Sequence, residues 1–183
     1  MISSETEQEL QLLHLLKQGD DTSHRSLYSA YIRHLTAVCS RYITNDEDVK
    51  DVLQESFIKI FSQIASFEYR GKGSLKGWLT KVTVNEALKF LNRTNRITLV
   101  EITENELDLH EEPPDIDLIP PSAIHALIRE LPDGYRTIFN LYVIENKSHK
   151  EIASLLGIKE STSASQLHRA KSILAAKIRQ YKL

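Results

Sequence analysis

Apolar residues recur at three- and four-residue spacing through most of this 183-residue chain, and this period most constrains the fold. One such stripe runs through Val49, Leu53, Phe57, Ile60 and Ile64. Side chains with this spacing share one face of an α-helix, whereas the side chains of a half-buried strand alternate with a period of two. No alternating segment of convincing length interrupts the helical pattern. The sequence therefore predicts an all-α protein.

Four helices are expected before residue 97. Gly19 ends the first, because glycine accepts the positive φ that closes a helix. Thr22 or Ser23 is the expected N-cap of the second, since a hydroxyl can accept a first-turn N–H. Residues 45–48 lead into the third, and their acids favour the positive end of the helix dipole. Ser74 is the expected cap of the fourth helix.

Residues 98–122 differ in composition from the rest of the chain. They hold eight of the 25 acidic residues, four of the five prolines, and no Lys or Arg. Proline disfavours helix and like charges repel, so this stretch predicts an extended acidic linker between two small helical domains, residues 1–97 and 123–183. The net charge of −2 hides this division, because all 23 basic residues lie outside the linker.

The second domain carries the pattern of a helix-turn-helix in residues 148–171. Ala153 lies where two helices would cross closely, and Gly157 can adopt the positive φ that ends the first of them. An earlier helix is expected to begin at Pro132. The second helix of such a motif enters a DNA major groove. A helical hairpin with a purely structural role remains the alternative.

A run of cations precedes the linker. Between Arg70 and Arg96 there are seven basic residues and one acid, Glu86. Several of them, with two amides, form what we call the basic stripe: Lys81, Asn85, Lys89, Asn92, Arg93 and Arg96. Such a helix face can track phosphates and read base edges, or it can be a solvated face only. The aromatic and basic side chains of loop 67–73 suit the stacking of an unpaired base.

An acidic face is expected on the third helix, because Asp48, Asp51 and Glu55 stand at i, i+3 and i+7. It could be a solvated face, a docking surface for a basic partner helix, or a metal site without histidine. Residues 71–74 are not a phosphate-binding loop, because they lack the leading glycine and a preceding strand.

Several classes of protein are disfavoured by the rest of the sequence. No apolar run approaches the roughly 20 residues that span a bilayer, and the N-terminus does not have the pattern of a secretion signal. The single cysteine, Cys39, allows no intrachain disulfide and lies in an apolar stripe, so we expect it in the core. We expect a cytoplasmic protein without enzymatic activity, cofactor, metal or membrane insertion.

Taken together, these segments resemble a bacterial RNA polymerase sigma factor of the extracytoplasmic-function (ECF) type in the sigma-70 family. The resemblance rests on Asn85 and on runs in both predicted domains, which are residues 27–31, 46–57, 77–79, 131–136 and 151–171. The chain is too short for the additional middle domain of housekeeping sigma factors, which indicates the ECF type. The resemblance implies a subunit that binds core polymerase and directs promoter binding, melting and transcription initiation.

The resemblance also implies partners and sites in the first domain. This domain, sigma region 2, would bind the coiled coil of the polymerase β′ subunit and melt the minus-ten element. The polymerase-binding motif falls on Asp48, Asp51, Gln54, Glu55 and Phe57. The minus-ten contacts fall on the basic stripe and on the loop residues Tyr69, Arg70 and Lys72.

In the second domain, sigma region 4, the resemblance places a recognition helix in the minus-thirty-five major groove. Its candidate contacts are Thr162, Ser165, Gln166, His168, Arg169 and Lys171. The acidic linker would thread a polymerase channel, the β subunit would complete the contacts with core, and an anti-sigma factor is the expected regulator.

Two other functions are compatible with parts of the sequence. A free-standing dimeric regulator would use only the helix-turn-helix, and would leave the acidic face and the first domain unexplained. An enzyme acting on nucleic acid would need the Asp48, Asp51 and Glu55 carboxylates to hold a divalent metal.

Overall fold

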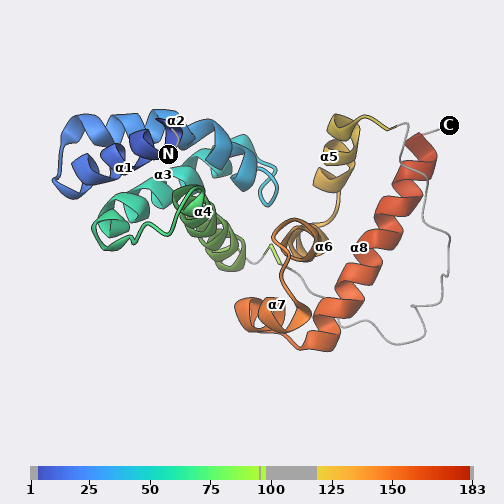
Figure 1. Ribbon diagram of the computed structural model, residues 1–183. Coiled ribbons are helices and arrows are strands. Elements are labelled where there is room, and N and C mark those ends of the chain that lie inside the picture. Colours follow the sequence, from blue (N-terminus) through green and yellow to red (C-terminus); the bar gives the residue numbers. More distant parts are fainter. Residues whose placement is uncertain (1–3, 95, 98–118, 182–183) are drawn as a thin grey trace. The chain divides into compact units, whose positions relative to one another are not determined.

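The computed structural model describes residues 4–94, 96–97 and 119–181, and its regular elements in these ranges are all helical (Figure 1). The all-α prediction is therefore confirmed. Contacts divide the chain into two compact units, Met1–Phe90 and Leu91–Leu183. Residues 98–118 of the predicted linker lie outside the described residues. Within those ranges, no helix combines the length and the apolar character that crossing a bilayer requires.

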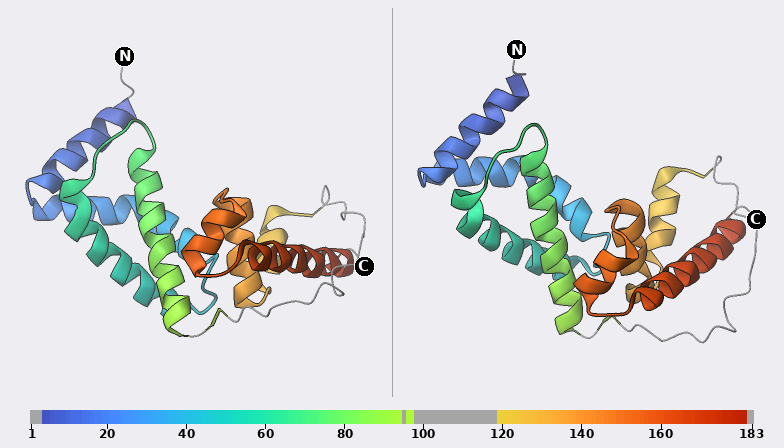
Figure 2. Two further views of the ribbon diagram at one scale, coloured as in Figure 1. Left: turned by 90° about the horizontal axis from the view of Figure 1, so that it is seen from below. Right: turned by 60° about the horizontal axis from the view of Figure 1, so that its bottom comes forward.

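Unit 1 contains four α-helices and a short 3-10 turn. Their bounds are α1 Ser4–Lys17, α2 Asp21–Cys39, α3 Asp46–Gln63, η1 Ile64–Ser66 and α4 Ser74–Arg93, the last of which crosses the division between the units. Helix α2 packs against both α1 and α3, and the η1 turn contacts α1 and α3. Figure 2 shows α4 as one continuous helix that starts where the loop after η1 ends.

The helix starts in unit 1 depend on side-chain caps. Helix α2 is capped by Asp20, so the prediction of Thr22 or Ser23 was wrong. The Asp20 carboxylate accepts hydrogen bonds from the Thr22 hydroxyl and from the Ser23 N–H at 2.8 Å, and these bonds lower the Asp20 pKa. A carboxylate there also faces the positive end of the helix dipole. Helix α3 is capped by Asn45, which accepts two first-turn N–H groups at 3.0 Å.

The core of unit 1 follows the apolar period. Leu27, Leu35, Ile60 and Leu79 are fully buried, each from a different turn of α2, α3 or α4. Cys39 is also fully buried, and desolvation raises its thiol pKa to about 12. A thiol with that pKa stays protonated at neutral pH, so Cys39 behaves as a small core residue, as expected.

Unit 2 is organised around one long helix. Its elements are α5 Pro121–Arg129, α6 Asp133–Phe139, a π-helical turn η3 Asn140–Ile144, α7 His149–Leu156 and α8 Glu160–Tyr181. Helices α5, α6 and α7 each pack against α8 (Figure 1). Pro121 occupies the first turn of α5, where its missing N–H is harmless, so the last two residues of the predicted linker are helical.

A buried arginine joins α5 to α6. The Arg136 side chain is 3% exposed, and its guanidinium donates to the carbonyl oxygens of Arg129 at 3.1 Å and Leu131 at 2.6 Å. It also pairs with the Asp133 carboxylate. The guanidinium thus hydrogen-bonds two carbonyl groups at and just after the end of α5, where a helix leaves its last carbonyls for other donors. Arg136 is a structural residue that the apolar period could not reveal.

Candidate functional site

The helix-turn-helix predicted in residues 148–171 is present. Ser148 and Glu151 form a capping box at the start of α7, in which the Glu151 carboxylate accepts the Ser148 N–H at 2.8 Å. That bond, and the Ser148 hydroxyl, lower the Glu151 pKa. Gly157 ends α7 with φ of +68° and ψ of +36°. Its N–H and that of Ile158 both donate to the Ala153 carbonyl oxygen, which turns the chain into α8.

Helix α8 presents most of the predicted minus-thirty-five residues on its outer side. His168 and Lys171 are exposed, and Thr162, Ser165 and Arg169 are half-buried. Gln166 is the exception, because it is fully buried. It stands three residues after the buried Ser163 and four before the buried Ala170, on the inward face, so its assignment as a DNA contact was wrong.

A polar and aromatic cluster fixes α8 against α7. The Nδ1 atom of His149 lies 2.9 Å from the Oγ of Ser163, which is fully buried. The His149 ring stacks on Tyr142, with ring centroids 4.6 Å apart. The Lys171 Nζ lies 5.9 Å from the centroid of the same tyrosine ring, within range of a cation–π contact. The cluster therefore connects the helix crossing to Lys171, one of the candidate minus-thirty-five contacts.

Helix α4 exposes the basic stripe. Lys81, Asn85, Lys89 and Arg93 are all exposed, as are Asn92 and Arg96. The buried side of the helix is apolar and includes Leu75, Leu79, Val82, Leu88 and Leu91. The prediction that the four-residue repeat faces solvent is confirmed, whereas contact with DNA stays a prediction.

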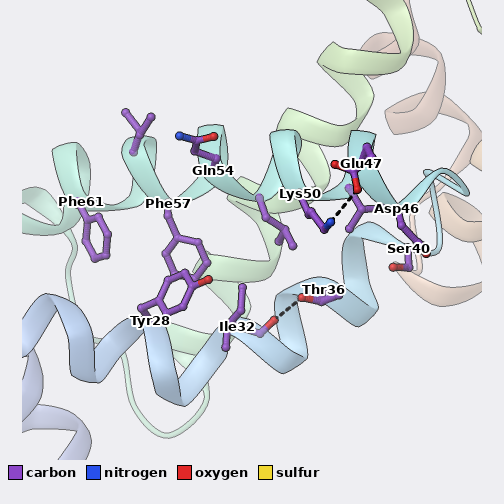
Figure 3. Close-up of a pocket in the computed structure, with 13 residues that line it drawn as sticks. Tyr28, Ile32, Thr36, Ser40, Asp46, Glu47, Lys50, Gln54, Phe57 and Phe61 are labelled. Carbon is purple, nitrogen blue, oxygen red and sulfur yellow. Dashed lines mark hydrogen bonds and ion pairs between the residues drawn. The ribbon is translucent and has the colours of Figure 1, made fainter.

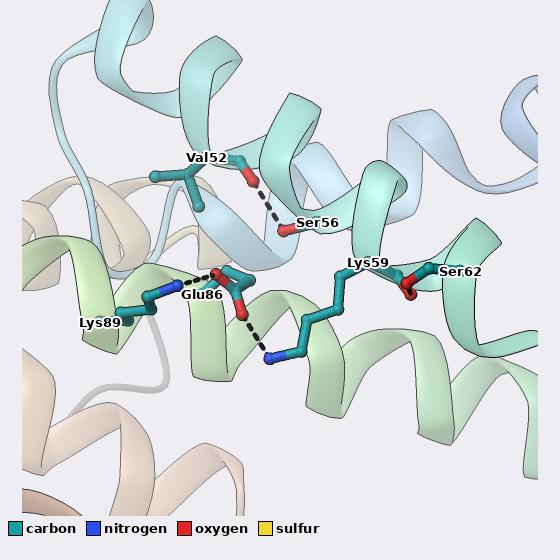
Figure 4. A network of polar contacts seen from close by, with 6 residues as sticks. All are labelled: Val52, Ser56, Lys59, Ser62, Glu86 and Lys89. Carbon is teal, nitrogen blue, oxygen red and sulfur yellow. Dashed lines mark hydrogen bonds and ion pairs between the residues drawn. The ribbon is translucent and has the colours of Figure 1, made fainter.

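One acid lies beneath this stripe. The Glu86 side chain is 7% exposed, and its Oε1 accepts a hydrogen bond from the Lys59 Nζ of α3 at 2.7 Å. Its Oε2 lies 3.6 Å from the Lys89 Nζ, one turn along α4 (Figure 4). The pairing with Lys59 compensates the burial of the carboxylate and joins α3 to α4.

The loop before α4 is held in place from several sides. The Phe67 ring is 8% exposed and packs 5.1 Å from the Trp78 ring, so Phe67 is not available to stack on a base as the sequence suggested. Tyr69 is half-buried, whereas Arg70 and Lys72 are exposed. Ser74 is the first residue of α4 and not its cap. Its hydroxyl accepts the Arg70 N–H at 3.1 Å and so closes the loop.

A groove of about 890 Å³ runs between α2 and α3 in unit 1. Figure 3 shows Tyr28, Phe57 and Phe61 along it, and the centroid of the Phe57 ring lies 4.7 Å from that of Tyr28 and 5.8 Å from that of Phe61. At one end the polar side chains of Glu47 and Lys50 form an ion pair of 2.7 Å. The groove is therefore apolar along its length and charged at that end.

Two of the predicted polymerase-binding residues of α3, Gln54 and Phe57, line this groove, and the other three lie on neighbouring faces of the helix. Asp51, Gln54 and Glu55 are exposed and Asp48 is half-buried, so the acidic face exists as predicted. Phe57 is 5% exposed and forms the wall of the groove, which makes it a structural member of the surface and not an exposed contact.

Two groove residues were missed by sequence reasoning. Ile58 is 59% exposed and Tyr28 is 47% exposed. Ile58 departs from the apolar stripe by one position and stands three residues after Glu55, which places it beside the acidic face. That departure from the period was visible in the sequence.

Across the part of the chain that the structure describes, no three His, Cys, Asp or Glu side chains are arranged to hold a metal ion.

Comparison with known proteins shows which family the chain resembles. The family model for sigma-70 region 2 matches residues 27–97, and that for sigma-70 region 4 matches residues 122–174. The ECF RNA polymerase sigma-E factor of Haemophilus influenzae is 28% identical over 179 residues, covering 91% of this chain and 93% of that protein. The ECF RNA polymerase sigma factor SigW of Bacillus subtilis is 26% identical over 176 residues, covering 90% and 93%.

Among solved structures, CnrH in complex with the cytosolic domain of CnrY matches with a TM-score of 0.48 and 19% identity. The match covers 92% of this chain and 96% of that chain.

The chain belongs to the sigma-70 family. Within that family it is a sigma factor of the ECF type, as its relatives of similar length are. It therefore binds core RNA polymerase and promoter DNA and directs the initiation of transcription, and it is not an enzyme. The reading of Asp48, Asp51 and Glu55 as an enzymatic site was wrong.

Proposed function

We propose that three separate surfaces of this sigma factor divide the work of initiation. The α2–α3 groove with its acidic face docks on the coiled coil of the polymerase β′ subunit. The basic stripe and loop 67–73 hold the minus-ten strand, and the outer side of α8 enters the minus-thirty-five major groove. The single observation that carries this proposal is the exposure of Lys81, Asn85, Lys89 and Arg93 along one side of α4.

Charge and shape support the docking surface. The exposed Asp51 and Glu55 stand seven and three residues before the exposed Ile58, which brings all three to one side of α3. A partner helix with basic residues beside an apolar stripe fits such a surface, because the charges orient it and the groove desolvates it. Ile58 and Tyr28 are 59% and 47% exposed at the same groove, so this surface offers apolar contacts that a solvated acidic face alone would lack.

The outer side of α8 supports the assignment to duplex DNA. Thr162, Ser165 and Arg169 lie toward the N-terminal half of the helix, which is the half that reaches base edges in helix-turn-helix proteins. His168 and Lys171 are exposed beside them and suit phosphate contacts. With Gln166 removed from the list, five candidate contacts remain.

Reconstitution with core polymerase tests the proposal. The chain should convert core into a holoenzyme that produces run-off transcripts from a cognate promoter, whereas core alone should not. Lys81→Glu should abolish promoter melting, detected by permanganate reactivity of unpaired thymines, and should leave binding to core unchanged. Holoenzyme that melts the promoter equally well with Lys81→Glu would refute the assignment of α4.

Regulation by an anti-sigma factor is part of the same proposal. A protein that covers the α2–α3 groove excludes the β′ coiled coil, so it keeps the factor inactive in the cytoplasm, where polymerase works. In a competition assay, an anti-sigma factor should lose affinity for Ile58→Asp in parallel with core. Unchanged affinity would place the inhibitor on another surface.

A further inference from the structure

Glu86 is the sole acid between Arg70 and Arg96, and it lies under the basic stripe. A negative charge in this position works against DNA binding, since phosphates approach the same helix face. Its burial is already compensated by Lys59, so its second contact, to Lys89, is not needed to satisfy the carboxylate.

The two contacts of Glu86 differ in kind. The bond to Lys59 at 2.7 Å is a short, charge-assisted hydrogen bond to an amino group that is partly enclosed, with a side chain 42% exposed. The approach to Lys89 at 3.6 Å exceeds hydrogen-bond length, and the Lys89 side chain is 69% exposed. Glu86 thus holds Lys59 firmly and attracts Lys89 by charge alone, so Lys89 can leave without disturbing the fold.

Resting on the function proposed above, we propose that Glu86 is a positioning residue that restrains Lys89 and lowers the affinity of this sigma factor for non-promoter single strands. Lys89 contacts a phosphate only by leaving Glu86. Each such contact is weakened by this exchange. The cognate minus-ten strand stays bound in spite of the same cost, because the rest of the stripe and the loop also hold it.

The test uses the full chain reconstituted with core polymerase. Binding of fluorescein-labelled oligo(dT) is measured by anisotropy for the wild type, Glu86→Gln, Lys89→Gln and the double variant. The neutral amide of Glu86→Gln can still accept from Lys59, so the helix contact remains. We expect Glu86→Gln to tighten oligo(dT) binding about two- to fivefold, the range for one exposed ion pair.

The Lys89→Gln background separates restraint of Lys89 from the removal of a charge. If Glu86 acts through Lys89, the gain disappears in that background. A gain that persists there is a long-range charge effect and overturns the proposal. Weaker oligo(dT) binding in both backgrounds, together with a lower unfolding temperature, also overturns it, because Glu86 would then be only a tie between α3 and α4.

A second variant carries the test if Glu86→Gln does not fold. In Lys59→Met the whole charge of Glu86 acts on Lys89, so Lys89→Gln should change oligo(dT) binding less than it does in the wild type; an equal or larger change overturns the proposal. Failure of the proposed function would be visible separately. If α4 does not bind single strands, Lys81→Glu should bind oligo(dT) as tightly as the wild type does.

Discussion

The turn of the helix-turn-helix allows one prediction to be worked out from the geometry. Gly157 has φ of +68°, a conformation that L-residues with a Cβ adopt only at a penalty. A Cβ built at this position meets no atom within 4 Å, so Gly157→Ala introduces no clash. The whole effect is the backbone penalty of about 1–2 kcal/mol.

That penalty should appear as a change in the unfolding temperature of unit 2. For a domain of this size, each kcal/mol shifts the midpoint by about 4–8 °C, so Gly157→Ala should lower it by about 4–16 °C. Gly157→Asn is the matched control, because asparagine tolerates the left-handed conformation better, and its effect should be clearly smaller.

The single tryptophan makes the assay specific to one unit. Trp78 lies in unit 1, so its fluorescence follows the unfolding of that unit, whereas circular dichroism follows both. Gly157→Ala should lower the midpoint of the unit 2 transition, which only circular dichroism detects. It should leave the fluorescence midpoint of unit 1 unchanged. Equal midpoints for the wild type, the alanine variant and the asparagine variant would refute the role assigned to the positive φ.

Three further predictions concern single side chains. Phe57→Ala should destabilise unit 1 by about 3–5 kcal/mol in urea unfolding, because the ring is buried, whereas Ile58→Ala at an exposed position should change it by less than about 0.5 kcal/mol; similar effects would contradict the burial. Thr137→Val should leave unit 2 as stable or more stable in calorimetry, since the fully buried Thr137 hydroxyl has no hydrogen-bond partner; marked destabilisation would reveal one. Burial, then the charges of Lys76 in α4 and of Arg41 just after α2, lowers the His34 pKa, so the unfolded chain takes up this proton more readily and stability is lost as pH falls below about 6.5. His34→Gln should flatten that part of the pH–stability curve, and an unchanged curve would refute this assignment.

The helices and the two faces of α3 and α4 could be predicted because they follow from a simple period. Val49, Leu53 and Phe57 mark the buried side of α3, and the exposed acids Asp51 and Glu55 stand two residues after Val49 and Leu53, on another face. In α4 the four-residue repeat of Lys81 and its successors falls opposite the buried leucines. Gly157 could be assigned to the turn because few other residues adopt its φ.

The errors occurred where polar residues occupy inward positions. Ser163 and Gln166 are fully buried in α8, although both residue types usually face solvent, so the resemblance to the family placed Gln166 among the DNA contacts. The burial of Arg136 could not be predicted either, because the carbonyl groups that it hydrogen-bonds come close to it only when α5 and α6 pack. Asp20 was missed as a cap because Thr22 and Ser23 are equally good candidates by residue type.

The central claim is that unit 1 binds polymerase through α3 and DNA through α4. The most direct test measures the affinity for core polymerase of two charge reversals at exposed positions, Glu55→Lys and Lys81→Glu, in the full chain. The account predicts that Glu55→Lys weakens core binding by about tenfold or more through like-charge repulsion, while Lys81→Glu leaves it within about twofold of the wild type. Loss of core binding in Lys81→Glu, with Glu55→Lys unaffected, would contradict the account.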